Sequence, residues 1–271
     1  MTGLKEHIMT EQLRDRTVFI TGSGGVLGST YVRRMLDEGA RVIASDLKGH
    51  RADQLIEMYG ANEQFRFYHL DVGDEDACND IFKHILADGW KPNVVLNNAA
   101  ITGELLMGTN KPFPEFADIS VEDFERTLRT NLTGAFMIAR QMDRDIVGKW
   151  PCTLINVASM YALNGAHHSI YEGMPFKNFS AYGVTKAGIH GLTVWLASYW
   201  AHRNVTVNTI APGAVFNNHS EEFQRRVGKL TMAGRMCEAD EIADVMLFLA
   251  SRQSGYMTGQ LVNVDGGFSA W

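Results

Sequence analysis

A tyrosine and a lysine stand four residues apart in the segment Tyr182-Gly183-Val184-Thr185-Lys186. In a helix, this spacing places the two side chains on one face. A phenol with a pKa near 10 is a poor base at neutral pH, and a neighbouring ammonium group is expected to lower that pKa by stabilising the phenolate. The spacing therefore predicts a tyrosine that exchanges protons with a substrate. The alternative is an ordinary pair of residues on a helix surface.

Two further polar residues accompany this pair. Ser159 follows the apolar run 153–157, which predicts a buried strand, so Ser159 is expected at a strand's carboxyl end, where doubly wound folds bind ligands. Asn131 and Gly134 fall inside the long helical pattern 121–147. Both residue types lower helix propensity, so we expect a local bend or a functional demand at this position.

A glycine-rich turn, TGSGGVLG at 21–28, stands between a predicted strand at 17–21 and a predicted helix at 27–38. Free backbone N–H groups and the positive end of a helix attract a pyrophosphate, and glycine lets the backbone approach it closely. The turn therefore predicts a dinucleotide site, with a plain tight turn as the alternative.

An aspartate indicates which dinucleotide is favoured. Asp46 ends the second predicted strand, 18 residues after Gly28. A carboxylate there can accept hydrogen bonds from both adenosine ribose hydroxyls and would repel a 2′-phosphate, which favours NAD over NADP. The turn itself contains no Arg or Lys to hold that phosphate, whereas Lys48 and Arg51, just beyond Asp46, argue the other way. The alternative role for Asp46 is a solvated cap of the next element.

Short β-branched apolar runs alternate along the chain with longer amphipathic segments. This alternation predicts one doubly wound α/β domain, in which a parallel sheet is covered by helices on both faces. The predicted strands are 17–21, 41–45, 65–70, 93–96, 153–157, 205–210 and 261–264, and the predicted helices are 27–38, 75–88, 121–147, 181–202 and 239–251.

Composition narrows the class of protein. The chain has 271 residues, 45% of them hydrophobic, and a formal net charge of −6. The acidic balance argues against nucleic acid as a partner, and no apolar run is long enough to predict a membrane span. The first residues lack the apolar core of a secretory signal, and three widely separated cysteines favour a reducing compartment. These features together predict a cytoplasmic protein.

The ordered set of motifs resembles the short-chain dehydrogenase/reductase family, in its branch of about 250 residues with a Tyr-x-x-x-Lys pair. The resemblance covers about residues 15–271 and is carried by TGSGGVLG at 21–28, LDV at 70–72, NNAA at 97–100, NLTG at 131–134, Ser159, YGVTK at 182–186, PG at 212–213 and VDGG at 264–267. It implies a Rossmann domain whose seven parallel strands have the order 3-2-1-4-5-6-7. It also implies hydride transfer between a nicotinamide and a carbinol carbon.

The resemblance assigns roles to individual residues. Tyr182 would be the general acid/base, and Lys186 would lower its pKa and hold the nicotinamide ribose. Ser159 would hydrogen-bond the reacting oxygen, and Asn131 would position Lys186 through a water molecule. The implied cofactor residues are Gly22, Ser23, Gly25, Val26, Leu27, Gly28, Asp46, Leu47, Asp71, Val72, Asn98, Ala99, Ala100, Tyr182, Lys186, Pro212, Gly213, Val215 and Asn217.

The chain departs from the family pattern between the serine and the tyrosine, which are separated by 22 residues where roughly a dozen is usual. We interpret 163–180 as a substrate-recognition loop, with a packing or subunit-contact loop as the alternative. The predicted substrate residues are Ser159, Tyr161, Asn164, His168, Glu172 and Tyr182. His167 and His168 have no third ligand at suitable spacing, so no metal site is predicted.

A second departure follows the sixth predicted strand, where Asn217 occupies a position at which the family usually has Thr. Residues 214–230 are predicted to form a lid over the pocket. If the substrate carries phosphate, the cations to consider are Lys177, Arg225, Arg226 and Lys229, although the two arginines also suit a solvated helix face.

The leading hypothesis is an NAD-dependent oxidoreductase that acts on a secondary alcohol of a sugar, sugar acid or sugar phosphate. The alternatives are a carbonyl reductase for another small hydroxy or keto compound, and a non-catalytic NAD-binding regulator. The stretches SIYEG at 169–173 and GAVFNN at 213–218 are similar to a subgroup of flagellin-modification and sugar-pathway oxidoreductases.

The expected organisation is an N-terminal extension at 1–15 followed by a catalytic domain at 16–271. The helices at 121–147 and 181–202 carry more apolar residues than one buried stripe requires, among them Phe136, Trp195 and Tyr199. With the family's usual assembly, this excess predicts a homotetramer.

Overall fold

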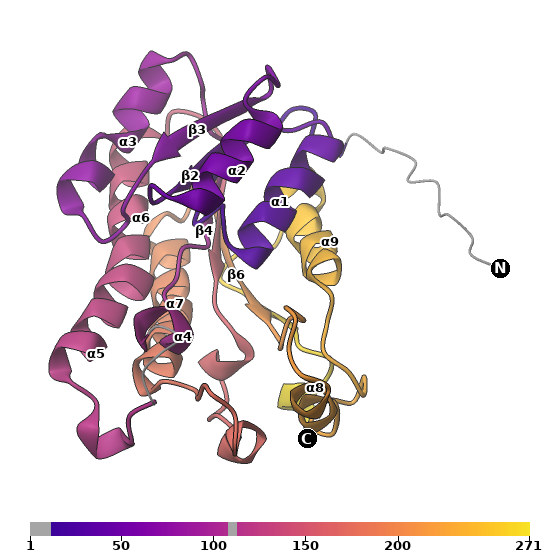
Figure 1. Cartoon of the computed structure of the whole chain (residues 1–271). Helices are drawn as coiled ribbons and strands as arrows, with labels where there is room; N and C mark the ends of the chain where they lie inside the picture. Colours follow the sequence, from indigo (N-terminus) through magenta and orange to yellow (C-terminus); the bar gives the residue numbers. More distant parts are fainter. Residues whose placement is uncertain (1–11, 108–112) are drawn as a thin grey trace.

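The computed structural model describes residues 12–107 and 113–271, and these residues form one parallel sheet with helices on both faces (Figure 1). The sheet has seven strands in the order β3-β2-β1-β4-β5-β6-β7, which confirms the predicted topology. The strands are β1 (Thr17–Thr21), β2 (Arg41–Asp46), β3 (Phe65–His69), β4 (Val94–Asn97), β5 (Cys152–Val157), β6 (Val205–Pro212) and β7 (Leu261–Val264).

Nine α-helices are found within the described ranges. They are α1 (Val26–Asp37), α2 (His50–Tyr59), α3 (Glu75–Ala87), α4 (Gly103–Met107), α5 (Val121–Leu128), α6 (Gly134–Asp145), α7 (Ser180–Tyr199), α8 (Glu221–Gly228) and α9 (Ala239–Ala250). Three of them, α2, α4 and α8, are absent from the predicted set. Each is short, and α4 and α8 lie in the segments 101–120 and 214–230, which have no long apolar periodicity.

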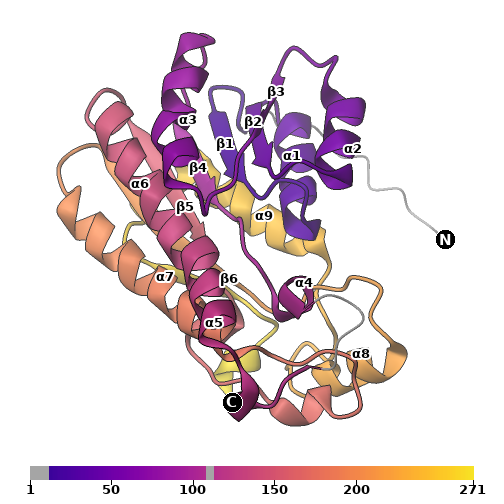
Figure 2. The same ribbon diagram turned by 60° about the vertical axis from the view of Figure 1, so that its left-hand side comes forward.

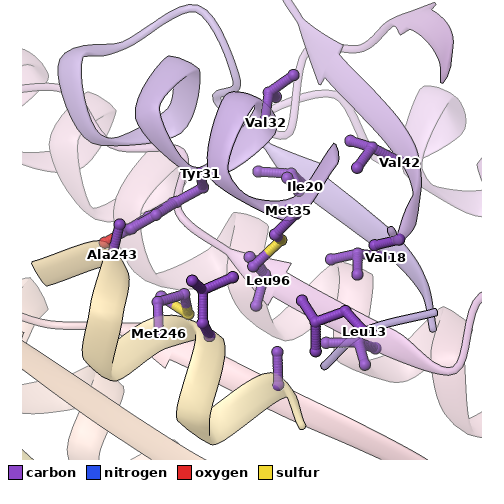
Figure 3. Packing of buried hydrophobic residues seen from close by; sticks show 14 of the residues in the cluster. Leu13, Val18, Ile20, Tyr31, Val32, Met35, Val42, Leu96, Ala243 and Met246 are labelled. Carbon is purple, nitrogen blue, oxygen red and sulfur yellow. The ribbon is translucent and has the colours of Figure 1, made fainter. Parts of the chain in front are cut away.

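Alternation along the strands divides the core into two layers. Val18 and Ile20 of β1 pack with α1 and α9, whereas Phe19, between them, packs with α3 and α6 on the opposite face. Figure 3 shows the first layer, in which Tyr31 of α1 extends to Ala243 of α9. Because both faces of the central strands are covered, β1, β4 and β5 are buried along their whole length.

The predicted helix 121–147 is interrupted where Asn131 and Gly134 occur. Residues Arg129–Thr133 form a π-helical turn between α5 and α6, so the expected local distortion is confirmed. Gly134 follows this turn directly, and a Cβ atom there would stand 2.9 Å from the carbonyl oxygen of Val72. The close approach of α6 to the segment after β3 therefore requires glycine at this position.

The described part of the N-terminal segment packs onto the domain. Leu13 is fully buried in the α1–α9 layer, and its backbone N–H donates to the carbonyl of Glu38. Residues 1–11 of the predicted extension lie outside the described residues. Across residues 12–107 and 113–271, no helix combines the length and the apolar character that crossing a membrane would need.

Helices α1 and α9 are also joined by a buried cation. The Arg34 guanidinium, whose side chain is only 8% exposed, contacts Asp240 at 2.9 Å and Asp244 at 2.5 Å. Arg33 contacts the same Asp240 at 2.6 Å, but its side chain is 44% exposed.

Replacement of Arg34 by methionine should lower the free energy of unfolding by about 2 kcal/mol, because it removes two hydrogen bonds to charged groups from a shielded position. The matched change Arg33→Met should cost less than about 1 kcal/mol, since exposed ion pairs contribute little. Urea denaturation of the two variants measures the difference. Equal losses would contradict this account of the α1–α9 contact.

Candidate active site

The segments that follow the strands meet at one edge of the sheet, because parallel strands all end on the same side. Apart from Tyr182 and Lys186 on α7, the predicted cofactor residues lie at or after the ends of β1, β2, β3, β4 and β6, and Ser159 follows β5. Helices α4 and α8 lie near the same end of the molecule (Figure 2). The topology thus brings the predicted cofactor and catalytic segments together, although they are spread over 200 residues of sequence.

The glycine-rich turn forms a cradle that side chains would fill. Gly22 has φ +65°, and a Cβ atom there would lie 2.6 Å from the Cα of Ala99. At Gly28 a Cβ atom would lie 2.2 Å from the carbonyl oxygen of Gly22. The α1 N-terminus begins directly after Gly25, with no side-chain cap and no acidic residue in its first turn. An uncapped helix end beside close-packed glycines fits a pyrophosphate.

Asn98 holds this turn from the next strand. Its Nδ2 donates to the carbonyls of Thr21 and Gly22 at 3.1 and 2.9 Å, and the Thr21 hydroxyl accepts from the N–H groups of Asn98 and Ala99. The amide of Asn98 therefore supports the cradle, and the contact with the cofactor that the resemblance implies stays a prediction.

Asp46 stands at the rim of the cradle. Its Oδ2 accepts from the Gly24 N–H at 2.6 Å and its Oδ1 from the Leu47 N–H at 2.8 Å. A Cβ atom at Gly24 would meet both the Arg51 Cβ, at 2.8 Å, and the Asp46 Oδ2, at 3.0 Å. Both the carboxylate that favours NAD and the arginine that argues for NADP thus approach the same glycine.

The other predicted cofactor residues lie on the segments after β3 and β6. Asp71 accepts from the Gly73 N–H at 2.8 Å, and Val72 is buried against α6. Pro212 ends β6, Gly213 packs on Asp265, and Val215 pairs with Cys237 in an isolated bridge. Asn217 is exposed, and its backbone N–H donates to His219 Nδ1 at 3.1 Å.

Ser159, Tyr182 and Lys186 come together beside this cradle. Tyr182 and Lys186 lie in the first two turns of α7, and the Lys186 Nζ is 5.5 Å from the centroid of the Tyr182 ring. The ammonium group is buried and donates to the Val157 carbonyl, at the end of β5, at 2.8 Å. Ser159 forms a side-chain hydrogen bond with Tyr182 and accepts from the Tyr161 N–H at 3.2 Å.

The expected lowering of the tyrosine pKa is wrong for this structure. Burial raises the pKa of Tyr182, and the hydrogen bond with Ser159 opposes that rise only in part. Burial also lowers the pKa of Lys186 to about 8. The spacing of Tyr182 and Lys186 indicates that an ammonium charge is near the phenol. It does not show the free-energy cost of removing both groups from water. The phenol is therefore protonated at neutral pH, in the form that donates a proton to a carbonyl.

Asn131 hydrogen-bonds to the segment that follows β4, and its role in positioning Lys186 through a water molecule stays a prediction. Its side-chain amide accepts from the Ile101 N–H at 2.7 Å and donates to the Ile101 carbonyl at 3.0 Å. A longer contact of 3.4 Å reaches the Thr185 hydroxyl, next to Lys186. The π-helical turn points the amide at the segment after β4 and thereby ties this segment to α7.

A cavity of about 850 Å³ lies on the substrate side of the site. Four of the six predicted substrate residues line it, namely Tyr161, Asn164, His168 and Glu172. Ser159 and Tyr182 do not line it, but Ser180 and Gly183, on either side of Tyr182, do. The insertion 163–180 therefore forms one wall of the cavity.

The opposite wall was not predicted. Phe113, Glu115, Phe116 and Ile119 line the cavity from the segment that follows α4. The only sequence signal for this wall was the unusual length of the stretch 101–120. Lys177 joins the two walls through an ion pair with Glu115 at 2.5 Å.

The segments 163–180 and 214–230 pack together. Ile170, Phe223, Val227 and Met236 form a small buried cluster between them. Arg226, from α8, donates to the backbone carbonyls of Ser169, Ile170 and Glu172 and pairs with Glu222. Arg226 therefore clamps the inserted loop and is not a solvated residue of a helix face.

The remaining predicted cations and histidines are placed as follows. Arg225 pairs with Glu222, and Lys229 is exposed. The His167 ring packs edge-on against Phe268 at 5.4 Å. Within residues 12–107 and 113–271, no three His, Cys, Asp or Glu side chains are grouped so as to hold a metal ion.

Comparison with known proteins identifies the family. Residues 24–269 match the family model described as enoyl-(acyl carrier protein) reductase. The chain is 30% identical to short chain dehydrogenases/reductase notP' of Aspergillus versicolor, over 96% of this chain and 89% of that protein. The protein belongs to the short-chain dehydrogenase/reductase family.

Other members of this family resemble the chain over nearly their whole length. The 3-oxoacyl-(acyl-carrier-protein) reductase FabG of Thermotoga maritima is 28% identical over 94% of this chain and 98% of its own. Galactitol 2-dehydrogenase of Rhizobium johnstonii is 29% identical over 93% and 94%. As a short-chain dehydrogenase/reductase, the protein is an oxidoreductase that uses a nucleotide cofactor.

Solved structures of short-chain dehydrogenases agree with the fold. The enzyme from Leptospira borgpetersenii with bound NAD⁺ has a TM-score of 0.82 at 29% identity and covers 99% of this chain and 98% of its own. A gluconate 5-dehydrogenase from Burkholderia cenocepacia, in complex with NADP and tartrate, has a TM-score of 0.82 at 24% identity, with 98% and 100% covered. The shared fold therefore accommodates either dinucleotide.

The buried ammonium group of Lys186 should make stability depend on pH. Between about pH 8 and 10.5 the unfolded lysine binds a proton that the folded lysine does not, so the free energy of unfolding should rise with pH through this window, by about 3 kcal/mol. Denaturation of the wild type and of Lys186→Met across this range isolates the effect, because other groups titrate equally in both. A constant difference in stability between the two proteins would contradict a depressed lysine pKa.

Proposed function

We propose that this enzyme interconverts a secondary alcohol and a ketone by hydride transfer to and from NAD, on a neutral polyol or sugar. The observation that carries the proposal is the cluster of Ser159, Tyr182 and Lys186, in which Tyr182 stands in the chain between two residues that line the cavity, Ser180 and Gly183. A substrate in the cavity would have to extend past Ser180 and Gly183 to reach the Tyr182 phenol. Its carbinol carbon would then lie between a proton-transfer group and the dinucleotide.

The bound dinucleotide supplies the hydride acceptor or donor, at the nicotinamide ring. The protonated Tyr182 phenol gives its proton to the carbonyl oxygen as a ketone becomes an alcohol. In the oxidising direction the phenol must first lose its proton to solvent, and the phenolate then takes the proton of the substrate hydroxyl. The Ser159 hydroxyl holds the reacting oxygen against Tyr182. Lys186 keeps a positive charge near the phenol, and its hydrogen bond to the Val157 carbonyl fixes where that charge stands.

The choice of NAD rests on Asp46. Its carboxylate is held at the rim of the cradle by two backbone N–H groups, and it would repel a 2′-phosphate. Gly22, Ser23, Gly25, Val26, Leu27 and Gly28 would surround the pyrophosphate, and the segments after β3, β4 and β6 would hold the remainder of the dinucleotide. Arg51 supports NADP as the alternative.

The choice of a neutral substrate rests on the charges around the cavity. Lys177 lines the cavity but is paired with Glu115, and Arg225 and Arg226 pair with Glu222. A phosphate bound by Lys177, the lysine that lines the cavity, would have to displace Glu115. Asn164, His168 and Glu172 can instead hydrogen-bond hydroxyl groups, in keeping with the resemblance to galactitol 2-dehydrogenase. A carbonyl reductase for another small hydroxy or keto compound is the alternative.

The proposal also covers the oligomeric state of the enzyme and its location in the cell. Trp195 and Tyr199 stack on each other at 4.7 Å on the outer face of α7 and are 59% and 57% exposed, and Phe136 is 46% exposed on α6. These apolar surfaces support a homotetramer. The three cysteines of the sequence are free, which supports the cytoplasm as the location.

Replacement of Tyr182 by phenylalanine should lower turnover of polyols at least 1000-fold, because the change removes the atom that exchanges the proton. Binding of NADH should change by less than about threefold, since the ring remains in place. Turnover is followed by the absorbance of NADH, and binding by its fluorescence. A variant that turns over polyols as fast as the wild type would exclude this mechanism. If the wild type itself is inactive but binds NADH, the non-catalytic regulator is the better account.

Replacement of Asp46 by serine should change the ratio of kcat/KM for NAD⁺ over NADP⁺ by tenfold or more in favour of NADP⁺, because the 2′-phosphate no longer meets a carboxylate. Arg51→Ala serves as the matched control and, compared with the wild type, should change the same ratio in favour of NAD⁺. Steady-state rates with the two cofactors at a fixed alcohol concentration give the ratio. A wild type that prefers NADP⁺ would overturn the assignment of Asp46.

A further inference from the structure

Arg226 of α8 contacts the end of a short helical turn in the inserted loop. Residues His168–Tyr171 form this 3₁₀ turn, and Glu172 is its C-terminal cap. The Arg226 Nη1 donates to the Glu172 carbonyl at 2.6 Å, and longer contacts of 3.4 and 3.3 Å reach the carbonyls of Ser169 and Ile170. Carbonyls at the end of a helical turn need donors from outside it, and an arginine side chain can serve several at once. Arg226 therefore caps the turn from another element.

A carboxylate on α8 orients this guanidinium. The Arg226 Nε donates to the Glu222 Oε1, one helical turn earlier, at 2.7 Å. This bond fixes one edge of the guanidinium to α8 while the Nη1 group reaches the loop. Arg225 pairs with the same Glu222, but its side chain is 56% exposed, against 26% for that of Arg226. The two neighbouring arginines thus share a partner and differ in their surroundings.

The loop depends on such side-chain contacts for its position. The backbone N–H groups of Ile170 and Glu172 donate to carbonyls three residues earlier, which shapes the turn but does not connect it to α8. Ile170 and Phe223 of α8 belong to one buried apolar cluster. Apolar packing has no directional preference, whereas hydrogen bonds do. The contacts of Arg226 therefore add the directional part of the link between the loop and α8.

The capped turn belongs to the wall of the cavity. His168, at its start, and Glu172, at its end, both line the cavity, whereas Arg226 does not. Arg226 can therefore act on a molecule in the cavity only through the loop. Both lining side chains carry groups that hydrogen-bond hydroxyls, and their positions follow from the position of the turn.

We propose that Arg226 is a positioning residue for substrate binding, which holds His168 and Glu172 where they hydrogen-bond the hydroxyl groups of a polyol. This inference rests on the proposed function. It assigns to α8 a part in the affinity for substrate. The catalytic cluster and the glycine cradle lie outside the loop, so loss of the clamp should weaken substrate binding and leave proton transfer and cofactor binding in place.

The kinetic test uses galactitol and NAD⁺ as substrates. Arg226→Met keeps an apolar stem and removes the donors, so KM for galactitol should rise about tenfold, while kcat and KM for NAD⁺ change by less than about twofold. Arg226→Lys keeps a cation that can donate to the carbonyls, and KM for galactitol should rise only about threefold. Arg225→Met is the matched control, because it also removes a partner of Glu222, and it should leave all three constants within about twofold.

Hydrogen exchange measures the position of the loop without any reaction. In Arg226→Met the amides of residues 168–174 should exchange about tenfold faster than in the wild type, and those of the glycine-rich turn at 21–28 should exchange at the same rate. Equal exchange of the loop in the two proteins would overturn the proposal. Faster exchange with an unchanged KM for galactitol would overturn it too, as would equal rises of KM for galactitol and NAD⁺, which indicate general structural damage.

Failure of the proposed function would be recognised separately. If the wild type oxidises galactitol with neither NAD⁺ nor NADP⁺, the proposed function fails for this polyol. Hydrogen exchange then decides alone whether Arg226 positions the loop, with the same expected and contradicting results.

Discussion

The arrangement of the site depends on one buried cation. The Lys186 ammonium group is removed from water, which lowers its pKa to about 8, and it donates a hydrogen bond to the Val157 carbonyl at 2.8 Å. That hydrogen bond spans from α7 to the carboxyl end of β5, so it sets how far the helix lies from the strand that carries Ser159. Because Tyr182 is one turn away on the same helix, the phenol is positioned by the same contact. Burial of the ammonium group costs desolvation free energy, and it places a positive charge beside a protonated phenol.

The dinucleotide side and the substrate side of the site are built on different principles. The dinucleotide side consists of short backbone segments at strand ends, where close approaches such as that of Gly22 to Ala99 require glycine. The substrate side consists of residues 113–119 and the inserted loop 163–180, which are held by side chains. Arg226 and the Lys177–Glu115 pair contribute to that support. Substitution of these side chains would reshape the cavity and leave the cradle intact, which is how one scaffold can serve different substrates.

Local patterns predicted the seven strands and the longer helices but missed α2, α4 and α8, and the family resemblance supplied the strand order. Strands β1 and β7 have the predicted bounds, and the pairing of Asn131 with Gly134 correctly indicated a distortion in the long helix, now seen as a π-helical turn. The wall around Glu115 and the clamp by Arg226 could not be predicted, because they arise from contacts between segments about 60 residues apart that carry no periodic pattern. The direction of the Tyr182 pKa was also missed, since burial is a property of the folded chain and not of the spacing between Tyr182 and Lys186.

The central claim, direct hydride transfer between a carbinol carbon and the nicotinamide, can be tested by isotope transfer. The wild-type enzyme is incubated with NAD⁺ and a polyol that carries deuterium on its carbinol carbons, and the reduced cofactor is then analysed by mass spectrometry. The account predicts one deuterium per molecule of NADH formed, because the hydrogen passes from carbon to carbon without exchange with water. Formation of a ketone with an unlabelled reduced cofactor would contradict it.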